Sequence, residues 1–184
     1  MHLANIRIDA SDSKIKDFNP IDREPIENLI PSWEVSNMFE EKLLSDPDNI
    51  QRLIKSREWK GNIAVEEGTA ANISRKIQLY NGQPGNTVFA KIEIMSDKNQ
   101  LKLFEFGYSD RVVAILNGNP IYKGTNKWRS RDYRYLGTVG LFDAIYLDLK
   151  KGKNTLIMAV SEDFGGWLIT GRFEDEGGVK VLEN

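Results

Sequence analysis

The stretch NTVFAKIEIMS, residues 86–96, alternates apolar and polar side chains with a period of two. One face of an extended chain here carries the apolar side chains Val88, Ala90, Ile92 and Ile94. The other face carries a threonine, a lysine and a glutamate. This is the pattern of a β-strand with one buried side and one polar side, so the stretch predicts that this part of the chain folds as a sheet.

Further segments after residue 100 have the length and composition of strands. They are short and rich in β-branched or aromatic residues. They comprise residues 101–109, 111–118, 121–124, 144–149, 154–162 and 166–173. The sequences between them, such as SDKNQ, NGNP and KKGKN, supply glycine, asparagine, aspartate or proline, which favour chain reversal. Antiparallel hairpins are therefore expected.

Two of these segments indicate how many layers the strands form. VVAIL, residues 112–116, is apolar at successive positions, as in a strand that is covered on both sides. AIYLDL, residues 144–149, alternates, as in a strand with one face in solvent. Two packed sheets accommodate both patterns, so the predicted fold is an all-β, two-sheet antiparallel sandwich.

The segment SDPDNIQRLIKSREW carries the signals of one short helix. Asp46 is suited to cap it, and Pro47 stands at the first helical position. Ile50, Leu53 and Ile54 share one face of such a helix. We expect this helix to pack on the sandwich through that face.

The chain divides into three predicted parts. Residues 1–59 form an N-terminal part, in which residues 1–32 are an extended arm because their prolines and scattered charges suit no regular element. Residues 60–175 form the sandwich, and residues 176–184 form a tail. The abrupt start in strand-like sequence predicts that the chain is a piece of a longer polypeptide.

Composition excludes several classes of function. The chain has 184 residues, a net charge of −2, no cysteine and one histidine, His2. A slightly acidic chain lacks the global attraction for phosphate backbones that nucleic-acid binders have, so no nucleic-acid partner is expected. No apolar run is long enough to span a bilayer, so no membrane partner is expected either. The compartment stays open, because both cytosolic and secreted proteins lack cysteine in many cases.

The order of elements over residues 60–175 resembles that of the galactose-binding-like jelly-roll domains. A strand into FGYSD, a hairpin at LNGNPIYKG, a long loop, a hairpin at LKKGKNTL and a final strand in GGWLITGRF follow one another. The resemblance implies a jelly-roll β-sandwich of the kind found in carbohydrate-binding modules and in accessory domains of glycoside hydrolases. It implies a non-catalytic module, with carbohydrate as the leading ligand class. The family shares no ligand motif that matches numbered positions here.

The long loop NKWRSRDYRYLG combines aromatic rings with guanidinium groups. An aromatic ring stacks on the apolar face of a sugar, while arginine and aspartate hydrogen-bond its hydroxyl groups. The candidate ligand-binding residues are therefore Trp128, Arg129, Arg131, Asp132 and Tyr133. The same residues also fit a stacking surface for nucleic acid, but the acidic remainder of the chain opposes that interpretation.

A purely structural interpretation of the loop stays open beside the ligand site. Its arginines would pair with Glu162 and Asp163 in the segment SEDFGG, and its tyrosines would cover the edge of the core. Under that alternative the protein is an interaction domain of a larger hydrolase or surface protein, and its partner is a neighbouring domain.

The other tryptophans are expected to pack inside the protein. Trp167 alternates with Ile169 and Phe173, which predicts a core position. Trp33 and Trp59 flank the helical segment and are expected to anchor it on the sandwich.

Enzyme chemistry has little support in the sequence. With His2 as the only histidine, a serine–histidine triad and histidine metal sites are effectively removed. A glycosidase needs only two suitably spaced carboxyl groups, so a carboxylate-pair hydrolase remains a second alternative. The candidate acids are Glu66, Glu67, Glu105, Asp132, Glu162 and Asp163.

No cofactor is expected, although structural calcium stays open. SDPDN, residues 45–49, and SDKNQ, residues 96–100, offer the oxygen ligands that calcium prefers. Neither has the spacing of a dedicated calcium loop, and both also suit a helix cap or a plain turn.

Overall fold

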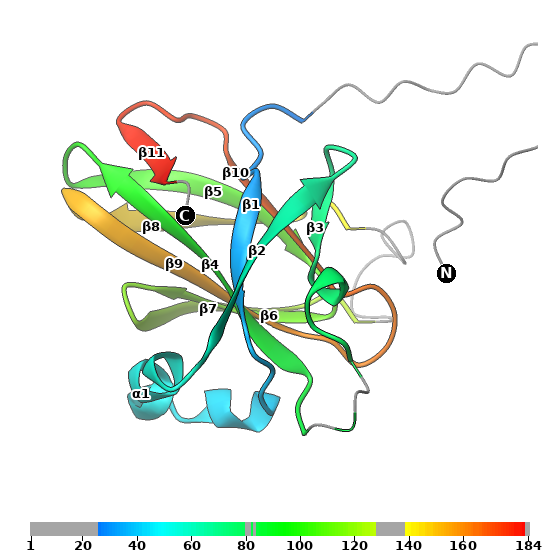
Figure 1. Cartoon of the computed structure of the whole chain (residues 1–184). Helices are drawn as coiled ribbons and strands as arrows, with labels where there is room; N and C mark the ends of the chain where they lie inside the picture. Colours follow the sequence, from blue (N-terminus) through cyan, green and yellow to red (C-terminus); the bar gives the residue numbers. More distant parts are fainter. Residues whose placement is uncertain (1–25, 80–81, 83, 128–138, 183–184) are drawn as a thin grey trace, which may run out of the picture.

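The computed structural model describes residues 26–79, 82, 84–127 and 139–182 (Figure 1). Strands dominate this part of the chain. They are β1 (Ser32–Ser36), β2 (Trp59–Glu66), β3 (Ala70–Asn72), β4 (Thr87–Ser96), β5 (Gln100–Tyr108), β6 (Arg111–Leu116), β7 (Asn119–Thr125), β8 (Asp143–Leu149), β9 (Gly152–Ser161), β10 (Leu168–Phe173) and β11 (Val179–Leu182). The short helices are η2 (Glu41–Ser45), η3 (Pro47–Asn49), α1 (Ile50–Lys55) and η4 (Ile73–Arg75).

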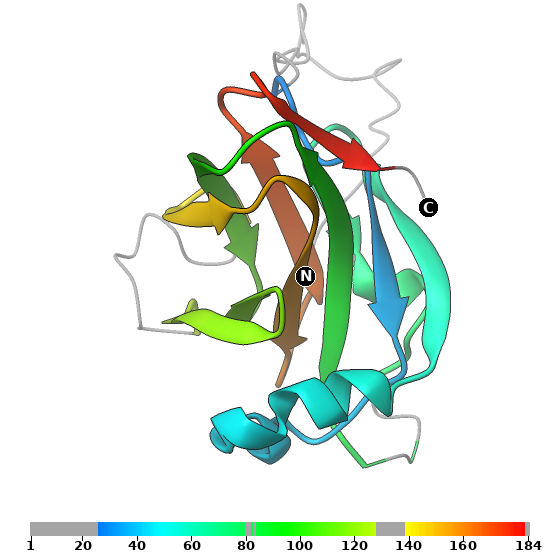
Figure 2. The same cartoon turned by 90° about the vertical axis from the view of Figure 1, so that its left-hand side faces the viewer.

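The strands form two packed layers joined at one side (Figure 2). The hydrogen-bonded order is β7-β6-β9-β4-β1-β2-β3-β10-β5-β8. Strand β11 pairs with the C-terminal end of β4. The two layers are continuous at β2, which pairs with β1 along most of its length and with β3 at its end. The described pairs are antiparallel, which confirms the predicted all-β jelly-roll sandwich.

Strand β1 lies inside the sheet, between β2 and β4. Trp33 and Val35 point into the core from it and are fully buried. Just before β1, Ile30 donates a backbone hydrogen bond of 2.8 Å to Gly171. Residues from 29 onward therefore belong to the sandwich wall, whereas residues 1–25 of the predicted arm lie outside the described part. The division of the chain at residue 60 remains a prediction.

The main core fills the space between the two layers. The apolar face predicted for residues 86–96 is confirmed, because Val88, Ala90, Ile92 and Ile94 all contribute to this core. Trp167 is fully buried there, as predicted, and its indole N–H donates to the carbonyl of Val160 at 3.1 Å.

The predicted helix is confirmed as α1, preceded by the two 3-10 helices. We call residues 41–55, which comprise η2, η3 and α1, the cap. The Asp46 carboxylate accepts the N–H of Asp48 at 3.1 Å, so Asp46 caps η3 as the sequence predicts. Ile50 and Leu53 are buried, and they pack with Phe39 in a second apolar cluster.

The cap covers the outer face of one sheet. Beneath it lie apolar side chains that point away from the main core, which include Phe89 from β4, Ile115 from β6 and Ile157 from β9. This second layer explains why VVAIL is apolar at successive positions, since β6 is covered on both sides. Strand β8 is covered on one side only, and Tyr146 on its other face is 69% exposed.

The prediction for Trp33 is wrong, and that for Trp59 agrees with the structure. Trp33 packs in the main core with its ring 6.5 Å from that of Phe104, on the opposite side of the sheet from the cap. Trp59 packs against the apolar cluster under the cap, and the Lys91 ammonium group lies 4.1 Å from its ring centre. Strand β1 begins at Ser32, so the period of two turns Trp33 inward.

Candidate functional site

The predicted ligand loop leaves and rejoins the sandwich at one end. Its candidate residues Trp128, Arg129, Arg131, Asp132 and Tyr133 lie outside the described residues. The approach to the loop is described. The N–H of Asn126 donates to the Asp110 carbonyl at 2.6 Å, and its side-chain amide donates to the Tyr108 carbonyl at 3.2 Å. The loop therefore departs from a fixed position.

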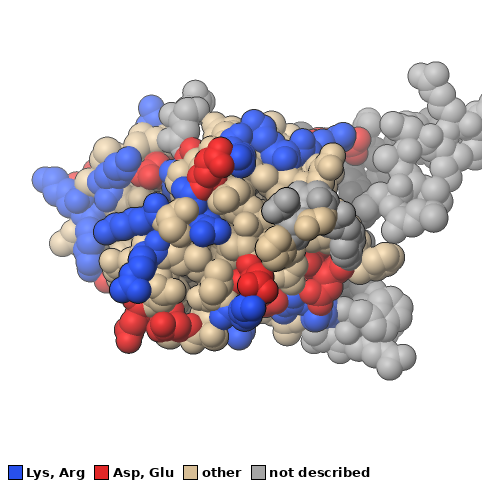
Figure 3. Space-filling model, turned by 60° about the horizontal axis from the view of Figure 1, so that its bottom comes forward, with Lys and Arg blue, Asp and Glu red and all other residues tan. Residues whose placement is uncertain are grey.

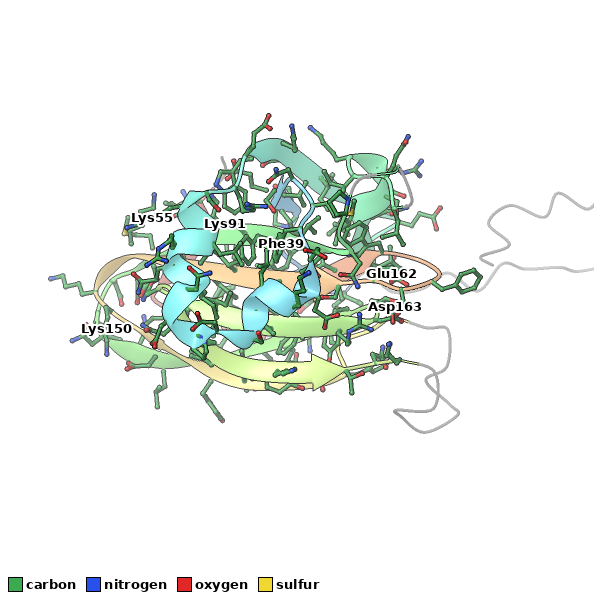
Figure 4. All side chains as sticks on the ribbon, turned by 90° about the horizontal axis from the view of Figure 1, so that it is seen from below. Phe39, Lys55, Lys91, Lys150, Glu162 and Asp163 are labelled. Atoms are coloured by element: carbon green, nitrogen blue, oxygen red, sulfur yellow. The ribbon has the colours of Figure 1, made fainter. Side chains whose placement is uncertain are left out.

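Residues 109–111, 126–127 and 161–166 surround this point, and we call them the rim. The register of β6 with β9 brings them together, because Arg111 lies opposite Ser161. The N–H of Asp110 donates to the Ser161 carbonyl at 2.8 Å, and the N–H of Asp163 donates to the Asp110 carboxylate at 3.1 Å. Figure 4 shows Glu162 and Asp163 at this end of the sandwich, and Lys55 and Lys150 toward the other.

Arg111 joins the rim to the cap. Its guanidinium group donates to both oxygens of Glu41, at 2.8 and 2.6 Å, and to both oxygens of Asp163, at 2.9 and 2.8 Å. Only 15% of the Arg111 side chain is exposed, against 32% of Glu41 and 42% of Asp163, so solvent screens these pairs in part. Hydrogen bonds to Asp163 and Glu41 hold the pKa of Arg111 above its ordinary value.

Asp163 is shared by two cations. Besides Arg111 it pairs with Lys127, the second residue of the long loop, and it accepts a hydrogen bond from Asn86 at 3.2 Å. Hydrogen bonds from Arg111 and Lys127 hold the pKa of Asp163 well below its ordinary value. The loop arginines that were expected to pair with Asp163 lie outside the described residues. Among the described residues, Arg111 of β6 and Lys127 pair with Asp163.

Glu162, the neighbour of Asp163, has the opposite environment. Its side chain is fully buried, and neither carboxylate oxygen has a hydrogen-bond partner of good geometry in the described part of the chain. Burial, and then the nearby charge of Asp110, raise the pKa of Glu162 to about 7. The Ser109 hydroxyl and the Phe164 N–H lie close enough to offset part of this increase.

Phe164 is the aromatic side chain that the rim presents to solvent. It follows Asp163 directly and is 86% exposed, the largest value among the exposed large apolar residues of the described chain. The two glycines after it, Gly165 and Gly166, form the turn into Trp167, and Gly165 has a φ of +124°. An exposed ring beside ionised groups is the combination that the sequence predicted for the neighbouring loop.

Two of the other acids considered for catalysis have structural partners. Glu66 pairs with Arg75, and Glu105 pairs with Arg172, each at 2.6 Å. Glu67 occupies a turn with a φ of +51°, and Asp132 lies outside the described residues. A carboxylate pair for hydrolysis therefore gains no support from Glu66 or Glu105, and that alternative stays untested.

The two stretches considered for calcium form a cap and a turn. Asp46 caps η3, as described above. In the turn between β4 and β5, the Gln100 side-chain amide donates to the Ser96 hydroxyl at 2.8 Å and to Asp97 at 3.2 Å. Among the described residues there is no cluster of three or more acids, histidines or cysteines suited to a metal ion.

Comparison with solved structures gives neighbours at low identity. A family 35 carbohydrate-binding module from an environmental isolate is 12% identical with a TM-score of 0.42, covering 58% of this chain and 83% of that one. A family 2 β-galacturonidase from Eisenbergiella tayi is 12% identical with a TM-score of 0.43, covering 79% of this chain and 24% of that one. The PA14 domain of the antifreeze protein MpAFP is 12% identical with a TM-score of 0.40, covering 88% of this chain and 92% of that one.

These neighbours contribute no site residue to this chain at such identity. No protein-family model matches the chain, and no curated protein sequence matches it. Within the described residues, no helix has the length and apolar character needed to cross a membrane.

Proposed function

We propose that this protein is a non-catalytic carbohydrate-binding module that holds a saccharide at the rim and the adjoining loop. The observation that carries the proposal is Phe164, a nearly fully exposed ring beside the ion-paired Asp163 and Lys127. A ring stacks on the C–H face of a pyranose, and the charged groups hydrogen-bond its hydroxyls. The resemblance of the strand order to galactose-binding-like jelly rolls supports the same ligand class.

The covered sheet face also favours the rim as the site. A sandwich can bind a ligand across an open sheet face or at its end loops, and here the cap buries the outer face of β4, β6 and β9. Phe89 and Phe39, the rings on that face, are at most 3% exposed. A saccharide therefore has no access to them, whereas the Phe164 ring at the rim is exposed.

A binding experiment tests the proposal directly. The protein is screened on a glycan array, and the best glycan is titrated by calorimetry against the wild type, Phe164→Ala and Trp128→Ala. We expect each variant to lose about tenfold or more in affinity, the loss of roughly one stacking contact. Tyr146→Ala is the control, because it removes another exposed ring, 69% exposed, from the outer face of β8, away from the rim.

Two results would count against the rim. If no glycan binds, the ligand class is wrong. If a glycan binds and Tyr146→Ala weakens it while the rim variants bind normally, the site is the outer face of β5 and β8 instead. Thermal unfolding of each variant confirms that the fold is retained.

A second candidate function is an interaction domain that packs against a neighbour. Leu101 is 65% exposed and Tyr146 is 69% exposed on the outer face of β5 and β8, where Leu103 lies directly opposite Tyr146. Adjacent exposed apolar side chains mark contact surfaces in many proteins. This candidate predicts that Leu101→Lys abolishes docking to an adjacent domain and leaves glycan binding unchanged.

A further inference from the structure

A second feature lies away from the rim, on the side of the molecule that carries the cap. A cavity of about 720 Å³ opens between the residues before the cap, the start of β2 and the segment after η4. Its apolar walls include Met38, Leu43 and Ile77, and its cationic side chains are Arg57, Lys60 and Lys76. Figure 3 shows that lysine and arginine are more widespread than acids on this side.

Two of the three cations have no carboxylate partner among the residues that the structure describes. Arg57 lies 5.6 Å from the Phe39 ring centre, and its Nε and Nη2 atoms both donate to the Ser56 hydroxyl. Lys76 donates to the carbonyl of Lys60 at 3.1 Å. A backbone carbonyl and a hydroxyl orient these groups but leave their charges uncompensated.

The charged groups around them are already neutralised. Lys60 pairs with Glu58 at 2.7 Å, and Glu40, the acid that lines the cavity, pairs with Lys42 at 2.9 Å. The cavity therefore has an excess of two positive charges next to apolar walls. Arg57 is half-buried and Lys76 is exposed, so an anion from solvent can reach both groups.

The backbone leaves room for Lys76. Gly61 in β2 has a φ of +92°, and a Cβ atom built there would lie 3.0 Å from the Lys76 Nζ. The ammonium group thus lies against β2 at a position that has no side chain. Its hydrogen bond to the Lys60 carbonyl holds it beside the cavity, at an exposed position.

We propose that this cavity binds a phosphate group. A phosphate monoester carries roughly −1.5 to −2 charges near neutral pH, which matches the two uncompensated cations. Arginine offers several N–H donors in a fixed fork, and lysine adds a point charge, a combination that suits the oxygens of phosphate. The cavity shares no residue with the rim, so this proposal does not depend on the proposed saccharide site.

The test is a titration of the whole chain with inorganic phosphate, followed by ¹H–¹⁵N NMR at constant ionic strength of about 20 mM, where screening is weak. We expect saturable shifts at Gly61, Arg57 and Lys76. Arg57→Gln and Lys76→Gln should each weaken the affinity about tenfold or more. Lys55→Gln is the matched control, since it removes an exposed cap lysine that does not line the cavity.

Titrations with glucose 6-phosphate, and with glucose as the control that lacks phosphate, identify the molecule that carries the bound phosphate group. Tighter binding of glucose 6-phosphate than of inorganic phosphate indicates a phosphorylated saccharide, and equal affinity indicates free phosphate. The proposal is overturned if the shifts do not saturate, if chloride at the same ionic strength reproduces them, or if Lys55→Gln weakens binding as much as Lys76→Gln does. Phe164→Ala should bind phosphate normally, which separates this site from the rim.

Discussion

Replacing Glu162 by glutamine should stabilise the protein in a strongly pH-dependent way. At about pH 8 we expect the free energy of unfolding to rise by on the order of 3 kcal/mol, and near pH 4 we expect almost no change. The reason is that Glu162 is buried without a hydrogen-bond partner of good geometry in the described structure, so its charged form is costly there. Glutamine keeps the shape of the side chain and removes the charge.

The pH window follows from the raised pKa. The ordinary pKa of this carboxyl is 4.5, and in the folded protein it is about 7. Between these values the folded protein keeps a proton that the unfolded chain has lost, so the contribution of Glu162 to stability falls as the pH rises. Chemical denaturation of both proteins from about pH 4 to 8 measures the difference, and a constant difference across that range would contradict the argument.

Asp163→Asn provides a control of opposite sign. The pKa of Asp163 is lowered by Arg111 and Lys127, so its charged form stabilises the folded protein. Its contribution is present at neutral pH and is lost as the pH falls through the depressed pKa. Removing this charge should therefore destabilise the protein at neutral pH. The expected effect is opposite to that of Glu162→Gln, even though the two residues are neighbours in the chain.

Replacing Arg111 by alanine should cost about 2 to 3 kcal/mol of stability, because it leaves two carboxylates without their shared cation in a partly buried place. The guanidinium group spans Glu41 in the cap and Asp163 in the rim. We therefore expect local loosening as well as a lower unfolding free energy. Hydrogen exchange at the amides of η2 should be faster in the variant than in the wild type, and this increase should exceed any increase in the core strands.

Arg75→Ala is the matched control for this prediction. Arg75 pairs with Glu66 through the same two-point geometry, at 2.6 and 2.9 Å, but its side chain is 67% exposed. An exposed pair is screened by water and salt, so no measurable loss of stability is expected. Equal effects of the two substitutions would show that burial of Arg111 is not what gives its ion pairs their strength.

Much of the fold follows from the sequence because local pattern and burial agree. The two-residue period of residues 86–96 set the inward face of β4, and Asp46 with Pro47 marked the start of the short helices. The position of β1 was harder to predict, because strand order depends on pairing between distant segments. Trp33 was assigned to the helix for its nearness in sequence, whereas the register of β1 with β2 and β4 turns it into the main core.

The candidate site was only partly predictable for the same reason. The sequence placed Glu162 and Asp163 near the long loop, but it gave no sign that Arg111 would pair with Asp163. That contact arises from the β6–β9 register and from the cap, which brings Glu41 to the same guanidinium group. The contrasting pKa shifts of two consecutive acids also depend on burial, which a sequence does not display. No sequence motif marked the proposed phosphate cavity, because its cations come from two separate segments.

The double pairing of Asp163 links the start of the long loop to the cap electrostatically. Lys127, Asp163, Arg111 and Glu41 form a relay of alternating charge from the loop to the cap. Displacing the Lys127 ammonium group should remove one of the cations that stabilise the Asp163 carboxylate and leave its pairing with Arg111 in place. A substitution at Lys127 should therefore alter the electrostatic environment of Glu41 in the cap, through Asp163 and Arg111.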